Sequence, residues 1–260
     1  MKKLSLILLF AISCAAVYAQ DNNANWSLAF ETSSYTYQEP SAGVKLNGPK
    51  YGVSLEYMAR NAQSGGLFLD TQFLYMTGSV TYNGALFDGT PYTASGIQDY
   101  YFETRGMLGL TLGNADQNGM DFWPYVGVGY RRLFNGMGAD QYGYNRTSTY
   151  TYLPAGMKAR FKMVNGWNLA FTGEYDIFLG GRQESDIAEA IINNQSTGYG
   201  LRGSAQLSKN LGRVSLFVEP FYRYWNIGES DVAYSYALDE YLYEPANHTD
   251  EYGVKIGIGF

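Results

Sequence analysis

Two pairs of residues in this sequence have the side chains and the spacing that proton transfer needs. His248 stands two residues before Asp250, and Glu174 stands two residues before Asp176. A spacing of two places both members of a pair on the same face of a strand, where an imidazole with a carboxylate, or two carboxylates, can act as acid and base. The alternative interpretation of His248, the single histidine, is an ordinary loop residue.

Other kinds of reactive site are missing from the sequence. Cys14 is the only cysteine, and there is no HExxH motif, Cys/His cluster or glycine-rich phosphate loop. The sequence therefore predicts no catalytic residue, no cofactor and no metal site. An enzyme built on His248 and Asp250 is kept only as an alternative.

The charged residues lie in segments where apolar and polar side chains alternate. A period of two over about 9–11 residues is typical of strands that cross a membrane with apolar residues outside and polar ones inside. Ten segments show it: Trp26–Glu31, Tyr51–Tyr57, Leu67–Tyr75, Tyr100–Leu112, Tyr125–Arg131, Leu153–Met163, Trp167–Ile177, Tyr199–Leu207, Val214–Arg223 and Glu251–Phe260. We predict an all-β, transmembrane, antiparallel up-and-down β-barrel of about ten strands, with eight or twelve as alternatives.

The N-terminus has the parts of a secretory signal peptide. Lys2 and Lys3 precede an apolar run, and Val17-Tyr18-Ala19 has small residues where a signal peptidase cuts. We predict a cleaved signal peptide over residues 1–19 and a single barrel domain over residues 20–260. One alternative is a membrane anchor, for which the run is too short to span about 30 Å. The other is a lipoprotein signal at Cys14.

The charge and composition of the exported part narrow its partners. Removing Lys2 and Lys3 leaves 16 basic and 24 acidic residues, a net charge of −8. This balance argues against nucleic acid, which requires a basic face. The 25 tyrosines favour bilayer interfaces, and no run of 18 apolar residues predicts a transmembrane helix.

The connections between the ten segments alternate in length. Those at residues 60–65, 113–121, 164–166 and 209–212 are short, and Asn165-Gly166 is a hairpin turn signal. Those at residues 38–49, 83–98, 135–149, 183–195 and 229–248 are longer and polar. Short turns on one side and long loops on the other are typical of outer-membrane barrels. We therefore predict periplasmic termini and five long extracellular loops.

The end of the chain carries the most specific pattern. Tyr252 and Phe260 begin and end a strand with apolar residues at every second position. It resembles the C-terminal strand of bacterial outer-membrane proteins, in which a terminal aromatic residue is recognised by the barrel-assembly machinery. With the phrases Pro124–Tyr130 and Leu153–Gly156, it resembles the small outer-membrane β-barrel (porin-like) superfamily of Gram-negative-type bacteria. The resemblance implies an outer-membrane location and contact with outer-membrane lipids and lipopolysaccharide.

The pair His248 and Asp250 also resembles part of the site of omptins, the ten-stranded outer-membrane proteases. Those use an Asp–His pair and a second carboxylate pair at the extracellular rim, but the surrounding residues here do not match and the chain is shorter. Lipid A deacylase-type barrels place His and Ser two residues apart, whereas Ala246 and Asp250 flank His248 at that distance. We expect no enzyme, with an omptin-like surface protease as the alternative.

The alternation places a nearly balanced set of charged side chains on the inward face of the predicted barrel. The acids are Glu31, Glu56, Asp70, Glu103, Glu174, Asp176, Glu219 and Glu251, and the bases are Arg105, Arg131, Lys158, Arg160, Arg202, Arg223 and Lys255. Buried charges must be paired, so one interpretation is a salt-bridged plug. The other is a narrow water-filled pore whose charges select solutes.

Prolines and loop composition complete the predictions. Pro220 has no N–H for the ladder, so we expect a local bulge or a gap there, while Pro124 and Pro154 lie near predicted strand ends. The loops are rich in Tyr and Asn, which suit the binding of an external ligand or host surface. We predict a structural or surface-interaction barrel with a closed lumen; the alternative is a narrow porin for small solutes.

Overall fold

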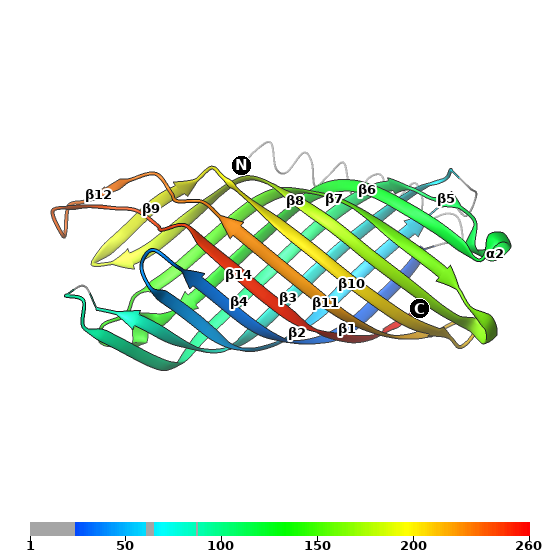
Figure 1. Cartoon of the computed structure of the whole chain (residues 1–260), viewed down its shortest axis with the longest axis horizontal. Helices are drawn as coiled ribbons and strands as arrows, with labels where there is room; N and C mark the ends of the chain where they lie inside the picture. The colour runs from blue at the N-terminus through cyan, green and yellow to red at the C-terminus, as the bar shows by residue number, and fades with distance from the viewer. Residues whose placement is uncertain (1–23, 61–64, 87) are drawn as a thin grey trace.

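The chain folds into one closed antiparallel barrel. The computed structural model describes residues 24–60, 65–86 and 88–260, so the predicted signal peptide over residues 1–19 lies outside the described residues. The ten long strands are β1 (Ala24–Glu39), β2 (Val44–Arg60), β3 (Leu67–Ala85), β4 (Pro91–Leu110), β6 (Met120–Gly136), β7 (Asn145–Lys162), β8 (Trp167–Ile187), β10 (Gly198–Asn210), β11 (Ser215–Ile227) and β14 (Asn247–Gly259). Figure 1 shows them tilted around a long barrel.

The shorter elements lie at the two ends of the barrel. They are β5 (Leu112–Gly113), α2 (Ala115–Asn118), β9 (Glu189–Gln195), which extends the β8 hairpin, and the separate hairpin of β12 (Ala233–Ser235) and β13 (Glu240–Leu242). No helix in the described part of the chain has the length and apolar character to cross a membrane.

The barrel closes where the first strand meets the last. β1 pairs with β14 in a continuous register that includes Leu28 with Ile258 and Glu31 with Lys255. The backbone N–H of Phe260 donates to the carbonyl of Trp26 at 2.8 Å, and that of Trp26 donates back at 2.9 Å. The predicted ten-stranded, all-β, antiparallel barrel is therefore confirmed, and no edge of the long strands is left open.

Alternation sets which side chains face lipid. Along β1, Ala29, Glu31 and Ser33 are buried, whereas Leu28 and Phe30 are about half exposed. Successive side chains of a strand point to opposite faces, so the polar set turns inward and the apolar set outward. An apolar outer band with a polar interior is the arrangement that a bilayer stabilises.

The outward face of β14 marks the edges of that band. Ile258 and Ile256 are followed by Tyr252, and polar residues come next at Asp250 and His248. Tyrosine rings suit the boundary between lipid and water. From Phe260 to Tyr252 a strand tilted by about 40° rises roughly 20 Å, close to the apolar band of about 25 Å in such barrels.

The predicted long loops are the main correction. The ranges 38–49 and 83–98 are mostly strand, because β1 and β2 are joined by residues 40–43 and β3 and β4 by residues 86–90. The range 183–195 is the β8–β9 hairpin, and only residues 228–246 form a long connection among those described. The prediction of five long extracellular loops was therefore wrong: pairing continues beyond the apolar band, where the outer face becomes polar.

Turn chemistry at the opposite end was predicted correctly. Asn165 and Gly166, between β7 and β8, have φ of 57° and 74°, and the Met163 N–H donates to the Trp167 carbonyl at 2.8 Å. Two successive positive φ values are what a tight hairpin of this twist requires, and Asn-Gly supplies them at low cost. The predicted hairpin turn is confirmed.

Three prolines interrupt the ladder without shifting it, and Pro49 does so in β2, where pairing with β3 stops at Asn47 and resumes at Lys50. Between β10 and β11 the pairing stops after Ser204 with Phe221 and resumes at Leu207 with Val218, in the same register. Pro220 lies in this interval, so backbone pairing is interrupted there without the register shift of a bulge, and a water-filled gap at this position stays a prediction. Pro154 lies inside β7, not near its end as predicted, and the β6–β7 pairing has an equivalent gap.

Candidate functional site

The candidate site is the charged interior of the barrel. The described structure buries Glu31, Asp70, Glu103, Arg131, Glu174, Asp176, Arg223 and Glu251. It half-buries Glu56, Arg105, Lys158, Arg160, Arg202, Glu219 and Lys255. All fifteen charges that alternation assigned to the interior therefore lie away from the lipid face. What the sequence left open is how they pair.

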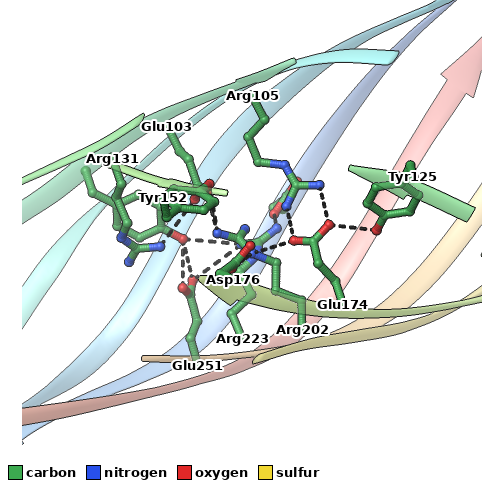
Figure 2. Close-up of polar contacts among 12 residues, drawn as sticks. Glu103, Arg105, Tyr125, Arg131, Tyr152, Glu174, Asp176, Arg202, Arg223 and Glu251 are labelled. Atoms are coloured by element: carbon green, nitrogen blue, oxygen red, sulfur yellow. Dashed lines mark hydrogen bonds and ion pairs between the residues drawn. The ribbon is translucent and has the colours of Figure 1, made fainter. Parts of the chain in front are cut away.

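Arg202 of β10 is the centre of the first layer. Its Nε lies 2.7 Å from Asp176 Oδ2 and 3.2 Å from Glu174 Oε1, and its Nη2 donates to Glu103 on the far strand β4. Arg105, also on β4, reaches across the lumen to Glu174 with two hydrogen bonds of 2.6 and 3.0 Å. Figure 2 shows these side chains meeting in the barrel interior. They bridge β4, β8 and β10 through the lumen.

A second layer crosses the barrel in another direction. Arg223 Nη2 of β11 lies 2.6 Å from Glu31 Oε2, and its Nη1 donates to Tyr101 Oη at 3.2 Å. Tyr101 of β4 in turn donates to Glu251 of β14 at 2.7 Å. The Arg131 guanidinium lies 3.7 Å from the centroid of the Tyr101 ring. β4 and β14 are separated by three strands of the sheet, so this chain of contacts spans the lumen.

Further pairs fill the interior toward the short-turn end. Lys255 Nζ lies 3.6 Å from Glu219 Oε1 and 3.7 Å from Glu31 Oε1. Arg160 donates to both oxygens of Asp121, from Nε at 3.1 Å and from Nη2 at 2.5 Å. Glu56, Asp70 and Lys158 border a small internal cavity together with Arg105 and Glu174.

Apolar side chains close the interior on the other side of the network. One cluster contains Tyr150, Tyr152, Phe178, Trp225 and Ile227, and another contains Tyr35, Leu46, Val80, Ala94, Ile97 and Met137. The first lies at the edge of the apolar band, since its Phe178 stands between the exposed Ile177 and Leu179, and the second lies where the strands extend beyond the band. The interior of that part is thus a packed core and not a polar tube.

The cavities at the two ends of the barrel are larger than those among the charged residues in its middle. The two larger ones, of about 300 and 360 Å³, lie at the extended end and at the short-turn end. Those among the charged layers measure about 100 and 40 Å³. The interior at mid-barrel therefore holds space on the scale of a few water molecules.

Several interior residues were missed by the sequence analysis. Lys50 donates to the Asp99 carboxylate, and Tyr125 donates to Glu174 Oε2 at 2.6 Å. Lys50 and Asp99 continue the alternation of β2 and β4, but they flank the ranges taken for loops. Tyr101 and Tyr125 were assigned to no role, because a tyrosine suits the inward and the outward face equally well.

The two pairs that could do chemistry are placed differently. Glu174 and Asp176 are held by Arg202, which engages both carboxylates. His248 and Asp250 alternate with the buried Thr249 and Glu251, so they point outward. Asp250 accepts a hydrogen bond of 2.5 Å from Tyr222, and the His248 ring lies 6.3 Å from that of Tyr224.

Among the described residues no group of three or more His, Cys, Asp or Glu side chains has the arrangement of a metal site. The acids of the interior are instead interleaved with guanidinium, ammonium and phenol groups. Such an arrangement neutralises charge and holds strands together.

Comparison with solved structures places the fold. The chain is similar to the outer membrane protease OmpT from Escherichia coli, with a TM-score of 0.60, 12% identity, and coverage of 92% of this chain and 96% of that one. Neisserial surface protein A has a TM-score of 0.36 at 12% identity, covering 90% of this chain and 97% of that one. The translocator domain of NalP from Neisseria meningitidis has a TM-score of 0.40 at 11% identity, covering 97% and 95%.

No protein-family model and no curated protein sequence matches the chain. At these identities the structural likeness concerns the fold alone. Three observations agree on this fold: the exposed apolar band, the closed register of β1 with β14 and the likeness to OmpT. The chain has the closed, ten-stranded fold of the small outer-membrane β-barrel proteins.

Proposed function

We propose that this protein is a closed outer-membrane barrel whose extended end serves as a surface-interaction element. The observation that carries the proposal is the layer around Arg202, which joins Glu103, Glu174 and Asp176 across the lumen. A guanidinium shared by three carboxylates is fixed in place by several charge-assisted hydrogen bonds. Solute passage would require these contacts to break.

The position of the membrane supports the second half of the proposal. The outward apolar residues of β8 continue past Tyr175 to Leu179, and β8 extends for eight residues beyond Leu179, to Ile187. Eight residues of a tilted strand rise about 20 Å. The barrel therefore projects well beyond the lipid, with tyrosine-rich tips that suit contact with an external ligand or host surface.

Outward basic residues suggest the lipid partner. Arg132 of β6 and Arg182 of β8 both pair in register with Thr149 of β7, and both are exposed on the outer face just beyond the apolar band. Arginines in this position suit the phosphates of lipopolysaccharide. We propose this orientation in the outer membrane, with both termini periplasmic after Sec export and Tyr252 and Phe260 as the assembly signal. Nucleic acid is not a proposed partner.

Conductance in planar bilayers tests the closed lumen. We expect the refolded mature protein to be silent, and the double variant Glu103→Ala/Arg202→Ala, which removes one acid and one base from the centre of the network and so keeps the net charge of the interior, to produce discrete steps. Arg182→Ala, which removes a cation from the outer face, is the matched control and should stay silent. Salt-dependent steps in the unaltered protein would overturn the proposal.

That last outcome would support the second candidate, a narrow porin. The specific observation in its favour is the pair of cavities of about 100 and 40 Å³ between the charged layers. Water in them would link the two mouths when side chains move. Ion selectivity would then change on substitution of Glu103 or Arg105.

We also propose that the barrel is not an enzyme. The outward direction of His248 and Asp250 separates this pair from the charged interior. Cleavage of denatured protein by the refolded barrel, lost in the variant His248→Ala, would favour the surface-protease alternative.

A further inference from the structure

A cavity of about 300 Å³ opens at the extended end of the barrel, beyond the apolar core. Its wall combines tyrosines, among them Tyr82, Tyr92, Tyr142 and Tyr144, with aliphatic residues such as Ile191. Tyr92 and Tyr142 meet edge to face with ring centroids 5.5 Å apart. The volume falls at the lower end of the range for small-molecule sites.

The floor of the cavity holds more acid than base. Arg146 Nη1 lies 2.6 Å from Glu39 Oε1 and 3.4 Å from Glu244 Oε1. The hydroxyl of Tyr37 lies 2.8 Å from Glu39 Oε1 and 3.0 Å from Glu244 Oε1, but its single proton serves one of them at a time. Two carboxylates thus share one guanidinium.

Glu244 is the group that is left incompletely satisfied. It is 6% exposed and lines the cavity. Tyr37 and Arg146 both contact Oε1, and no hydrogen bond from the described residues reaches Oε2. Oε2 is not fully buried and is open to a donor from the cavity. A cation there would form a charge-assisted hydrogen bond with it.

We infer that this cavity binds an organic cation, a primary ammonium, amidinium or guanidinium group carried on an apolar or aromatic body. The cationic head would meet Glu244 Oε2 at the floor, and the body would lie against the tyrosine rings of the wall. Aromatic faces attract cations, and aliphatic residues such as Ile191 and Leu242 suit an apolar body. An anionic ligand would face Glu39 and Glu244 and is disfavoured.

Protonation of the floor competes with the ligand. The pKa of Glu244 is raised to about 7, because burial, together with the Glu39 carboxylate, outweighs the attraction of Arg146. The other titratable groups facing it are Tyr37, Tyr144 and Tyr150. Because a protonated Glu244 lacks the charge that holds the cation, affinity should rise with pH, by about tenfold from pH 6 to pH 8.

Calorimetric titration of the refolded full barrel with benzamidine, which stays cationic over this range, tests the inference. We expect saturable binding of benzamidine but not of neutral benzamide. In Glu244→Gln, affinity at pH 8 should fall at least tenfold and lose its pH dependence. The matched control Glu240→Gln, which removes an acid on the exposed β13 at the same end, should bind as the unaltered protein does.

Equal binding of benzamide, or unchanged affinity in Glu244→Gln, would overturn the inference. Heat-modifiable mobility in electrophoresis verifies that each variant is folded, and Glu244→Asp, which keeps the charge, should retain the pH dependence. The inference deepens the proposed surface-interaction role. The cation site and the closed lumen are tested independently, since the first is measured as binding in detergent and the second as conductance in a bilayer.

Discussion

At the scale of residues, alternation determined the face of each charge but not its partner. The period of two assigned Glu103 and Arg202 to the interior, and the structure brings them together from β4 and β10. Their meeting depends on the stagger of strands far apart in the sequence, which the pattern of one strand does not contain. The Lys50–Asp99 pair was missed for a related reason: its strand ends were taken for loops.

Removing Arg202 alone should strongly destabilise the barrel. Arg202→Met leaves Glu103, Glu174 and Asp176 without their shared guanidinium, and breaking a buried ion pair from one side costs about 3–5 kcal/mol. Urea unfolding in detergent or vesicles measures this loss. Arg182→Met, at the half-exposed pair with Glu184, should change stability by less than about 1 kcal/mol. Equal losses in the two variants would contradict the central role of Arg202.

Glu244 should give the extended end a pH-dependent stability. Its pKa rises from the ordinary 4.5 to about 7 on folding, so between these values the folded state holds a proton that the unfolded state does not. Stability therefore falls as the pH rises through this window, by up to about 3 kcal/mol. Urea midpoints at pH 5 and pH 8 should differ more in the unaltered protein than in Glu244→Gln, and parallel shifts would refute the assignment.

At the scale of elements, the sequence predicted strand centres well and strand ends poorly. Apolar alternation is strong only where the outer face meets lipid. Beyond Tyr51, β2 turns Pro49, Asn47 and Lys45 outward and the contrast between its faces fades, although the backbone stays paired to β1 and β3. Pairing between strands needs only backbone groups, so the strands continue beyond the residues whose side chains alternate between apolar and polar.

The Asn165-Gly166 turn should tolerate little change. Gly166 has φ +74°, a region that other residues occupy at a cost, so Gly166→Ala should destabilise the barrel by about 1 kcal/mol. Gly173→Ala is the matched control, because Gly173 lies in β8 with open space around its missing side chain. Urea midpoints compare the two. A larger loss of stability for Gly173→Ala than for Gly166→Ala would contradict the prediction that the turn conformation makes Gly166 hard to replace.

At the scale of the whole molecule, the closure of the barrel could be predicted from the sequence, whereas its extended shape could not. An even strand count, alternating turn lengths and an aromatic C-terminal residue all indicated a barrel. The extension beyond the apolar band, the cavity at the extended end and the ion-paired interior arise from contacts between distant strands. Arg146, for example, joins Glu39 and Glu244 from opposite ends of the chain.

Phe260 should matter more for assembly than for the stability of the finished barrel. Its side chain is 56% exposed, so Phe260→Ala removes few contacts and should change the urea midpoint of the refolded protein slightly, by less than about 1 kcal/mol. If the residue is an assembly signal, the same variant should accumulate far less in outer membranes of cells. Substitution of Leu211, an exposed turn residue, serves as the control. Equal accumulation of both variants would reject the signal.

The pairing of β1 with β14 also sets a limit on how fast the molecule can form. It joins residues such as Ser33 and Glu251, which are 218 positions apart, so the chain entropy of closing a very large loop is lost before these contacts can repay it. The other pairs of long strands join strands that follow one another along the chain, whereas one edge of β1 stays unpaired until β14 is available. The interval before β14 pairs with β1 is therefore the period in which this chain is most exposed to aggregation.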